Sequence, residues 1–173
     1  MSDLWVFGYG SLMWRPGFDH VERQPALLRG AHRSLCVYSI VHRGTKRRPG
    51  LVLGLDAGGS CRGIAFRVEA PEADKTLDYL RDREQVTNVY LETHRQIELL
   101  APRRRKVKAV CFVVDREHPQ YAGRLPVSEQ AEIVRYGQGA SGDNIEYVAN
   151  TLSHLREMGL REPTLTALMT SLG

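Results

Sequence analysis

The sequence has few cysteines and no long apolar run, and each absence excludes a class of protein. Its 173 residues include three cysteines, Cys36, Cys61 and Cys111, without the CxxC spacing of zinc or redox motifs. Each lies in or beside an apolar stretch, so we expect buried, reduced thiols. No apolar run approaches the roughly 20 residues of a membrane-spanning helix, and no leader-like segment opens the chain. We therefore expect a cytoplasmic protein without a membrane partner.

The familiar spacings of catalytic motifs are also missing. The six histidines show neither HxxxH nor HExxH spacing and do not pair with cysteines, so no metal site is predicted. The glycine-rich string at 8–12, GYGSL, lacks the third glycine of a dinucleotide loop and the Lys-Ser/Thr ending of a P-loop. No GxSxG elbow occurs. Metal catalysis, nucleotide binding through this loop and serine-triad hydrolysis are therefore disfavoured.

Charged residues are only slightly unbalanced in sign. The 24 Lys and Arg exceed the 20 Asp and Glu, which gives a formal net charge of +4. The basic residues gather mainly at 43–48 and 103–108, where the neighbouring pattern predicts loops or hairpin tips. Neither cluster is interleaved with aromatic residues that could stack on bases. We therefore expect solvated turns and no nucleic-acid partner.

The composition, with 42% hydrophobic and 25% charged residues, is typical of a globular domain. A chain of this length buries roughly 70% of its unfolded surface, which suffices for a core without disulfides or metals. No repeat or low-complexity linker interrupts it. We therefore predict a single domain over residues 1–173.

Apolar patterning predicts strands that surround one central helix. Strands are expected at 5–7, 27–38, 89–100 and 107–114, the last two as antiparallel partners. Two further apolar stretches, 50–55 and 61–68, flank the turn-like string DAGGS and predict a hairpin.

Helix signals are concentrated in the middle and at the end of the chain. Pro71 opens a helix that should run to about Arg83. Ser128 and Ser141 are candidate N-caps of two later helices, the second of which should stop at Gly159. The apolar stripe of that second helix is Ile145, Val148, Leu152 and Leu155. This order predicts an α+β fold, with a mostly antiparallel sheet or small β-barrel and flanking helices.

Two features of the sequence are candidates for a functional site. The glycines of the 8–12 loop allow backbone N–H groups to face an anion such as a carboxylate, although a tight turn without a ligand is the alternative. Glu84 closes the helix that Pro71 opens, where the helix dipole disfavours negative charge and raises the carboxyl pKa. A raised pKa suits a general base. The alternative is a solvent-facing glutamate beside Arg81 and Arg83.

Four separated blocks resemble the ChaC-like gamma-glutamylcyclotransferases. The first block is WVFGYGSLMWRPGF at residues 5–18. The others follow in the family's order: HRGT with PGLV at 42–52, LRDRE at 80–84 and GASGDNIEY at 139–147. Together they extend over nearly the whole chain. The resemblance implies a gamma-glutamylcyclotransferase-like fold.

The resemblance also implies a reaction and a set of site residues. In this family the α-amine of a γ-glutamyl group attacks its own γ-carbonyl, and glutathione yields 5-oxoproline and Cys-Gly. Glu84 matches the family's catalytic glutamate. Tyr147 lies in a block similar to the family segment that closes over the site, and its phenol is expected to hydrogen-bond the substrate. A tyrosine packed in the core is the alternative. The matching substrate-binding loop is Tyr9, Gly10, Ser11 and Leu12. Because the substrate carries its own nucleophile, the expected partner is this small molecule alone, without a metal or other cofactor.

One segment departs from the family pattern. Ahead of His42 the chain reads CVYSIV at 36–41, where a Trp-Gln-Gly-like segment is common in the family. This difference concerns the choice of substrate rather than the class of reaction. Glutathione is the expected substrate. Another γ-glutamyl peptide or amine is an alternative, as is a non-catalytic module that binds a small acid.

Overall fold

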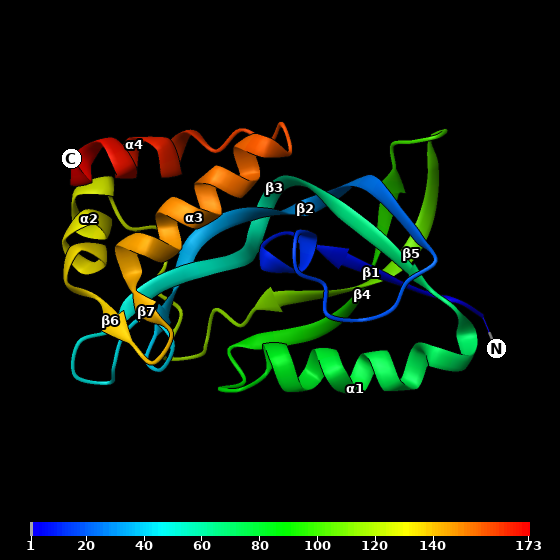
Figure 1. Ribbon diagram of the computed structural model, residues 1–173, viewed down its shortest axis with the longest axis horizontal. Helices are drawn as coiled ribbons and strands as arrows, with labels where there is room; N and C mark the ends of the chain where they lie inside the picture. Colours follow the sequence, from blue (N-terminus) through cyan, green and yellow to red (C-terminus); the bar gives the residue numbers. More distant parts are fainter. Residues whose placement is uncertain (1) are drawn as a thin grey trace. The chain divides into compact units, whose positions relative to one another are not determined.

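The computed structural model describes residues 2–173, which form two compact units (Figure 1). The first unit contains the chain up to Ser34 together with Leu55–Asp115. The second contains Leu35–Gly54 and Arg116–Gly173. The single domain over residues 1–173 stays a prediction.

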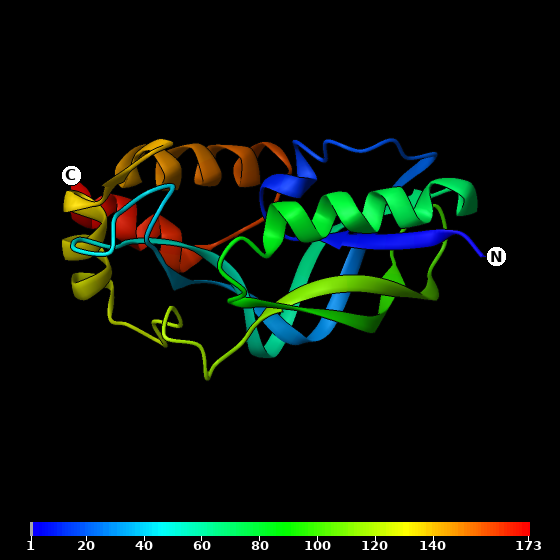
Figure 2. The ribbon, with the colours of Figure 1, turned by 90° about the horizontal axis from the view of Figure 1, so that it is seen from below.

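Five strands form a closed barrel in the order β1-β3-β2-β4-β5 (Figures 1 and 2). Strand β1 pairs antiparallel with β3, and β4 pairs antiparallel with both β2 and β5. Strands β1 and β5 pair in parallel, with Val6 opposite Val110. The strands are β1 (Leu4–Gly8), β2 (Glu22–Ser39), β3 (Gly50–Val68), β4 (Tyr90–Leu99) and β5 (Arg105–Val114). The predicted α+β class with a small, mostly antiparallel barrel is confirmed.

Strand β3 is one continuous strand of 19 residues, so the predicted hairpin between 50–55 and 61–68 is wrong. The turn-like glycines Gly58 and Gly59 do adopt positive φ angles, +96° and +68°. They bend the strand without ending it, because the neighbouring strand β2 continues alongside. The His32 ring nitrogen Nδ1 lies 2.9 Å from the Gly58 carbonyl oxygen and ties β2 to this bend.

Helix α1 (Ala73–Glu84) follows a short 3₁₀ turn, η2 (Ala70–Glu72), and confirms the predicted helix. Of the apolar residues Ala73, Leu77 and Leu80, which recur at helical spacing, only Leu80 is fully buried, and Thr76 is buried beside it. Strands β4 and β5 pair over their full length, as the sequence predicted. Figures 1 and 2 show α1 covering one side of the barrel.

The second unit is mainly helical. It contains α2 (Val127–Tyr136), α3 (Asn144–Glu157) and α4 (Pro163–Leu172), with a two-stranded sheet of β6 (Gln138–Gly139) and β7 (Gly142–Asp143). Along α3, three of the four stripe residues are buried, whereas Ile145 is 37% exposed. Helix α3 ends before Gly159, whose φ of +73° confirms the predicted stop.

Both predicted serine N-caps are wrong. Pro126 occupies the N-cap of α2 and Asp143 that of α3, and neither makes a side-chain capping bond. Ser128 is therefore inside α2. Ser141 lies in the turn between β6 and β7, where its hydroxyl is 2.9 Å from the His42 ring nitrogen Nδ1. The Ser141 hydroxyl therefore bonds a distant residue and does not cap α3.

The three cysteines are free and buried, as predicted. Burial raises the pKa of Cys111 to about 12, so this thiol stays protonated near neutral pH. None of the helices formed by residues 2–173 has the length and apolar composition needed to cross a membrane.

Candidate active site

The glycine loop begins where β1 ends, in the first unit. Tyr9 and Leu12 are buried, whereas Ser11 is exposed and starts a short 3₁₀ helix, η1 (Ser11–Met13). The first N–H groups of any helix lack partners within that helix. At η1 these are the groups expected to face an anion, and that role stays a prediction.

A buried arginine that was not predicted as a site residue donates a hydrogen bond to the backbone of this loop. Arg33 on β2 is only 8% exposed, and its Nε donates to the Tyr9 carbonyl oxygen at 2.6 Å. Its Nη2 donates to the Arg62 carbonyl at the same distance. A buried guanidinium is stable only when its donors are paired. The available signal was a charged residue inside the apolar stretch 27–38.

A second arginine holds the loop from its exposed side. Arg83 on α1 donates through Nη2 to the Ser11 hydroxyl oxygen at 2.9 Å. Its Nη1 donates to the carbonyl oxygens of Arg15 at 2.7 Å and Pro16 at 3.0 Å. The C-terminal end of α1 is thus fastened to the segment 11–16.

Glu84 follows Arg83 directly and is the last residue of α1. The residue keeps part of its surface open, but its carboxyl group is deeply desolvated, and desolvation raises its pKa above the ordinary 4.5. The positive charge of Arg83 offsets part of that rise.

The Glu84 carboxyl accepts no hydrogen bond and makes no ion pair with any of residues 2–173. Arg81 pairs with Glu92 at 2.7 Å, and Arg83 donates to the loop. Against the alternative of a solvent-facing glutamate beside Arg81 and Arg83, Glu84 is half-buried and unpaired with either arginine. An acid with a raised pKa and an unoccupied carboxyl group is suited to proton transfer.

Tyr147 belongs to the second unit. It lies on α3, and its hydroxyl oxygen accepts the Leu53 backbone N–H at 2.9 Å. The Arg43 guanidinium lies 5.5 Å from the centre of the Tyr147 ring, and Arg43 also donates to the Asp143 carbonyl oxygen. Within the first unit, Arg83, the residue before Glu84, contacts the 9–12 loop at Ser11.

Asn144 is a further residue that sequence reasoning missed. It is fully buried, its Oδ1 accepts the Leu51 N–H and its Nδ2 donates to the Leu51 carbonyl, both at 2.8 Å. The side-chain amide therefore replaces a neighbouring strand at this point of β3. Its place in the GASGDNIEY block marked it as part of the resemblance but indicated no role.

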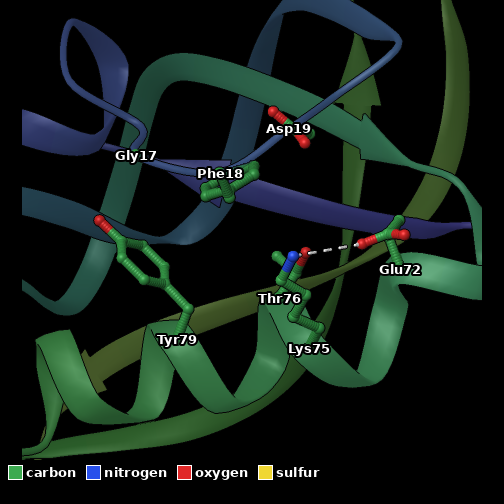
Figure 3. A pocket seen from close by; sticks show the side chains of 7 residues that line it. All are labelled: Gly17, Phe18, Asp19, Glu72, Lys75, Thr76 and Tyr79. Atoms are coloured by element: carbon green, nitrogen blue, oxygen red, sulfur yellow. Dashed lines mark ion pairs between the residues drawn. The ribbon is translucent and has the colours of Figure 1, made fainter.

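A cavity of about 150 Å³ lies between the segment 17–19 and α1 (Figure 3). Its lining includes Phe18, Thr76 and Tyr79 but neither Glu84 nor any residue of the 9–12 loop. Within residues 2–173, no three His, Cys, Asp or Glu side chains form a group that could hold a metal ion.

Residues 4–172 match the family model described as "ChaC-like protein". The chain is similar to the glutathione-specific gamma-glutamylcyclotransferase of Escherichia coli K12, at 33% identity over 97% of this chain and 72% of that protein. It is also similar to the human glutathione-specific gamma-glutamylcyclotransferase 1, at 30% identity over 98% of this chain and 78% of that protein.

The fold is similar to a solved structure as well. The crystal structure of a gamma-glutamyl cyclotransferase specific to glutathione from yeast superposes with a TM-score of 0.85 and 23% identity. The superposition covers 99% of this chain and 98% of the yeast chain.

Proposed function

Because this chain belongs to the ChaC-like family of gamma-glutamylcyclotransferases, we propose that it cleaves glutathione into 5-oxoproline and Cys-Gly. The names of the bacterial and human relatives support glutathione as the substrate. The observation that carries the mechanism is the desolvated Glu84 carboxyl at the end of the helix that Arg83 ties to the 9–12 loop.

The reaction is an intramolecular aminolysis. The α-amine nitrogen of the γ-glutamyl group attacks the γ-carbonyl carbon, a ring C–N bond forms, and the amide C–N bond to cysteine breaks. No water is consumed, and the products together contain all the atoms of glutathione. Holding the amine against the carbonyl can lower the barrier by about 7 to 11 kcal/mol. The site therefore has two tasks, which are to fold the substrate and to move one proton.

Glu84 moves that proton. The substrate amine is an ammonium near neutral pH and cannot attack until it loses a proton, which the Glu84 carboxylate accepts. The same carboxyl group then donates the proton to the departing cysteine amine. A raised pKa brings Glu84 closer to the working pH, which favours both transfers.

The loop Tyr9, Gly10, Ser11 and Leu12 binds the γ-glutamyl group. Backbone N–H groups at the start of η1, together with the Ser11 hydroxyl, hold the α-carboxylate or the oxyanion that develops at the γ-carbonyl. The buried Arg33 guanidinium adds positive charge behind Tyr9. Both features favour an anionic group over a neutral one.

Tyr147 supplies a further hydrogen bond to the substrate, in keeping with the family block in which it lies. Its hydroxyl also accepts the Leu53 N–H, so the same group would serve the strand and the substrate.

The experiment is the release of 5-oxoproline and Cys-Gly from glutathione by the purified protein, with EDTA present. We expect equal amounts of the two products, and we expect the Glu84→Gln variant to abolish their release. The Asp82→Asn variant is a matched control, because Asp82 is an exposed carboxylate on the same helix.

A panel of γ-glutamyl dipeptides and γ-glutamyl amines accompanies glutathione in this assay. Turnover of one of these compounds but not of glutathione would keep the reaction and replace the substrate. Binding of glutathione without any product would indicate a non-catalytic module and would refute the enzymatic proposal.

A further inference from the structure

We propose that Arg83 is the positioning residue of this site, because its guanidinium fastens the substrate-binding loop to the helix that carries Glu84. The kinetic effects expected of this residue rest on the proposed function, whereas its contacts with the loop are given by the structure. Arg83 is adjacent to Glu84 in the chain, and its side chain reaches back across 72 residues to Ser11.

The guanidinium holds both ends of one segment. Nη2 donates to the Ser11 hydroxyl at the start of 11–16, and Nη1 donates to the Arg15 and Pro16 carbonyl oxygens at its end. A planar group with several fixed donors can span such a set of acceptors, whereas the single ammonium of lysine cannot. Arg83 therefore fixes the conformation of the loop as well as its position.

The contact with Arg83 also restricts the orientation of the Ser11 hydroxyl group. Because Arg83 donates to the Ser11 oxygen, the hydroxyl hydrogen must point elsewhere. Ser11 is exposed, so its hydroxyl hydrogen is free to donate to a substrate. This arrangement suits an anionic or carbonyl oxygen of the substrate.

Tyr79 completes the attachment one turn earlier on α1. Its hydroxyl oxygen accepts a hydrogen bond from Arg83 Nη1 at 3.0 Å, and its ring packs edge-on against Phe18 at 6.3 Å between centroids. Figure 3 shows the Tyr79 hydroxyl directed toward the segment at Gly17, where a Cβ atom would overlap it. The close fit leaves Arg83 little freedom to rotate.

Arg81 provides a matched control on the same helix. Arg81 pairs with Glu92 and Asp78. Within residues 2–173, it makes no hydrogen bond to the loop. Replacing either arginine by glutamine removes one charge from α1. Only the change at Arg83 releases the segment 11–16.

The first test is amide hydrogen exchange, which needs no substrate. The amides of Met13 and Arg15 donate to the Gly10 and Ser11 carbonyl oxygens and so report on the loop. We expect both amides to exchange about tenfold faster or more in Arg83→Gln than in the unmodified protein. Arg81→Gln should leave both rates unchanged. Equal protection in all three proteins would overturn the proposal.

The second test is kinetic. We expect Arg83→Gln and Arg83→Lys both to raise KM for glutathione by about tenfold, with a smaller fall in kcat. Arg81→Gln should change neither constant. Full activity in Arg83→Lys would overturn the proposal, because it would show that charge alone is required.

A double-mutant cycle isolates the contact itself. If Arg83 acts through the Ser11 hydroxyl, the effects of Arg83→Gln and Ser11→Ala on KM should be clearly non-additive. Additive effects would contradict an action through Ser11. A protein without glutathione turnover would refute the proposed substrate, while the exchange experiment would still decide the role of Arg83.

Discussion

The two units use their polar side chains differently. In the second unit, Asn144 and Tyr147 are bonded to the backbone of β3 at Leu51 and Leu53. In the first unit, the Glu84 carboxyl has no partner among the described residues, and desolvation raises its pKa.

This difference separates structural from chemical roles. A buried polar group that satisfies the backbone stabilises the fold, and the fold loses free energy when it is removed. A desolvated carboxyl group without a partner destabilises the fold and is retained where it has a chemical task. The comparison predicts that replacing Glu84 changes turnover, whereas replacing Asn144 changes stability.

The largest expected effect is that of Glu84→Gln. We expect kcat for 5-oxoproline release to fall by about 100-fold or more, because the amide cannot take up the ammonium proton. KM should change little, and the free energy of unfolding should not decrease. Product release measured by chromatography and urea unfolding measured by circular dichroism test both points. Retained turnover would remove Glu84 from the mechanism.

Asn144→Ala should show the opposite pattern. The change leaves the Leu51 N–H and carbonyl buried without partners, so we expect the free energy of unfolding to fall by about 2–4 kcal/mol. Asn150→Ala is the control, because Asn150 is exposed on the same helix and should cost less than about 0.5 kcal/mol. Urea unfolding measures both. Equal stability of the two variants would contradict the structural role of Asn144.

The raised pKa of Glu84 predicts a pH dependence with a definite sign. Activity requires the carboxylate, so kcat/KM should rise with pH through a pKa above the ordinary 4.5. Stability should change in the other direction, because a raised folded-state pKa makes the fold less stable as pH increases through it. The stability advantage of Glu84→Gln should therefore grow with pH above 4.5. If kcat/KM instead falls only at or below pH 4.5, Glu84 is not the group that takes up the proton.

The smallest effect is expected for Tyr147→Phe. Loss of the acceptor for the Leu53 N–H should lower the free energy of unfolding by about 1 kcal/mol. The ring contact with Arg43 is kept in this variant. If Tyr147 also binds the substrate, KM for glutathione rises as well. Unchanged stability with a raised KM would assign Tyr147 to the substrate alone and would weaken the comparison between the units.

Local patterns were sufficient for several elements. The helix signal at Pro71, the apolar stretches of β4 and β5, and Gly159 after α3 depend on neighbours within a few residues, and each was predicted close to its observed bounds. The predicted hairpin within β3 failed because the glycines that signal a turn also permit a bend inside a paired strand.

The contacts around the site were not predictable from local patterns. Arg33 meets Tyr9 across 24 residues, Arg83 meets Ser11 across 72, and Asn144 meets Leu51 across 93. Sequence periodicity carries no information at such separations, and arginines on a polar helix face usually point to solvent. Its place at the C-terminal end of the helix and the family resemblance singled out Glu84 among the carboxylates of that helix.

By itself, the sequence determined the fold class, the order of most elements and the family, because these follow from short-range periodicity and from blocks of residues in a set order. The tertiary structure alone decided which polar groups are satisfied and which are left for chemistry. Desolvation and hydrogen bonding depend on what surrounds an atom in space, and for Glu84 and Ser11 those surroundings come from distant parts of the chain.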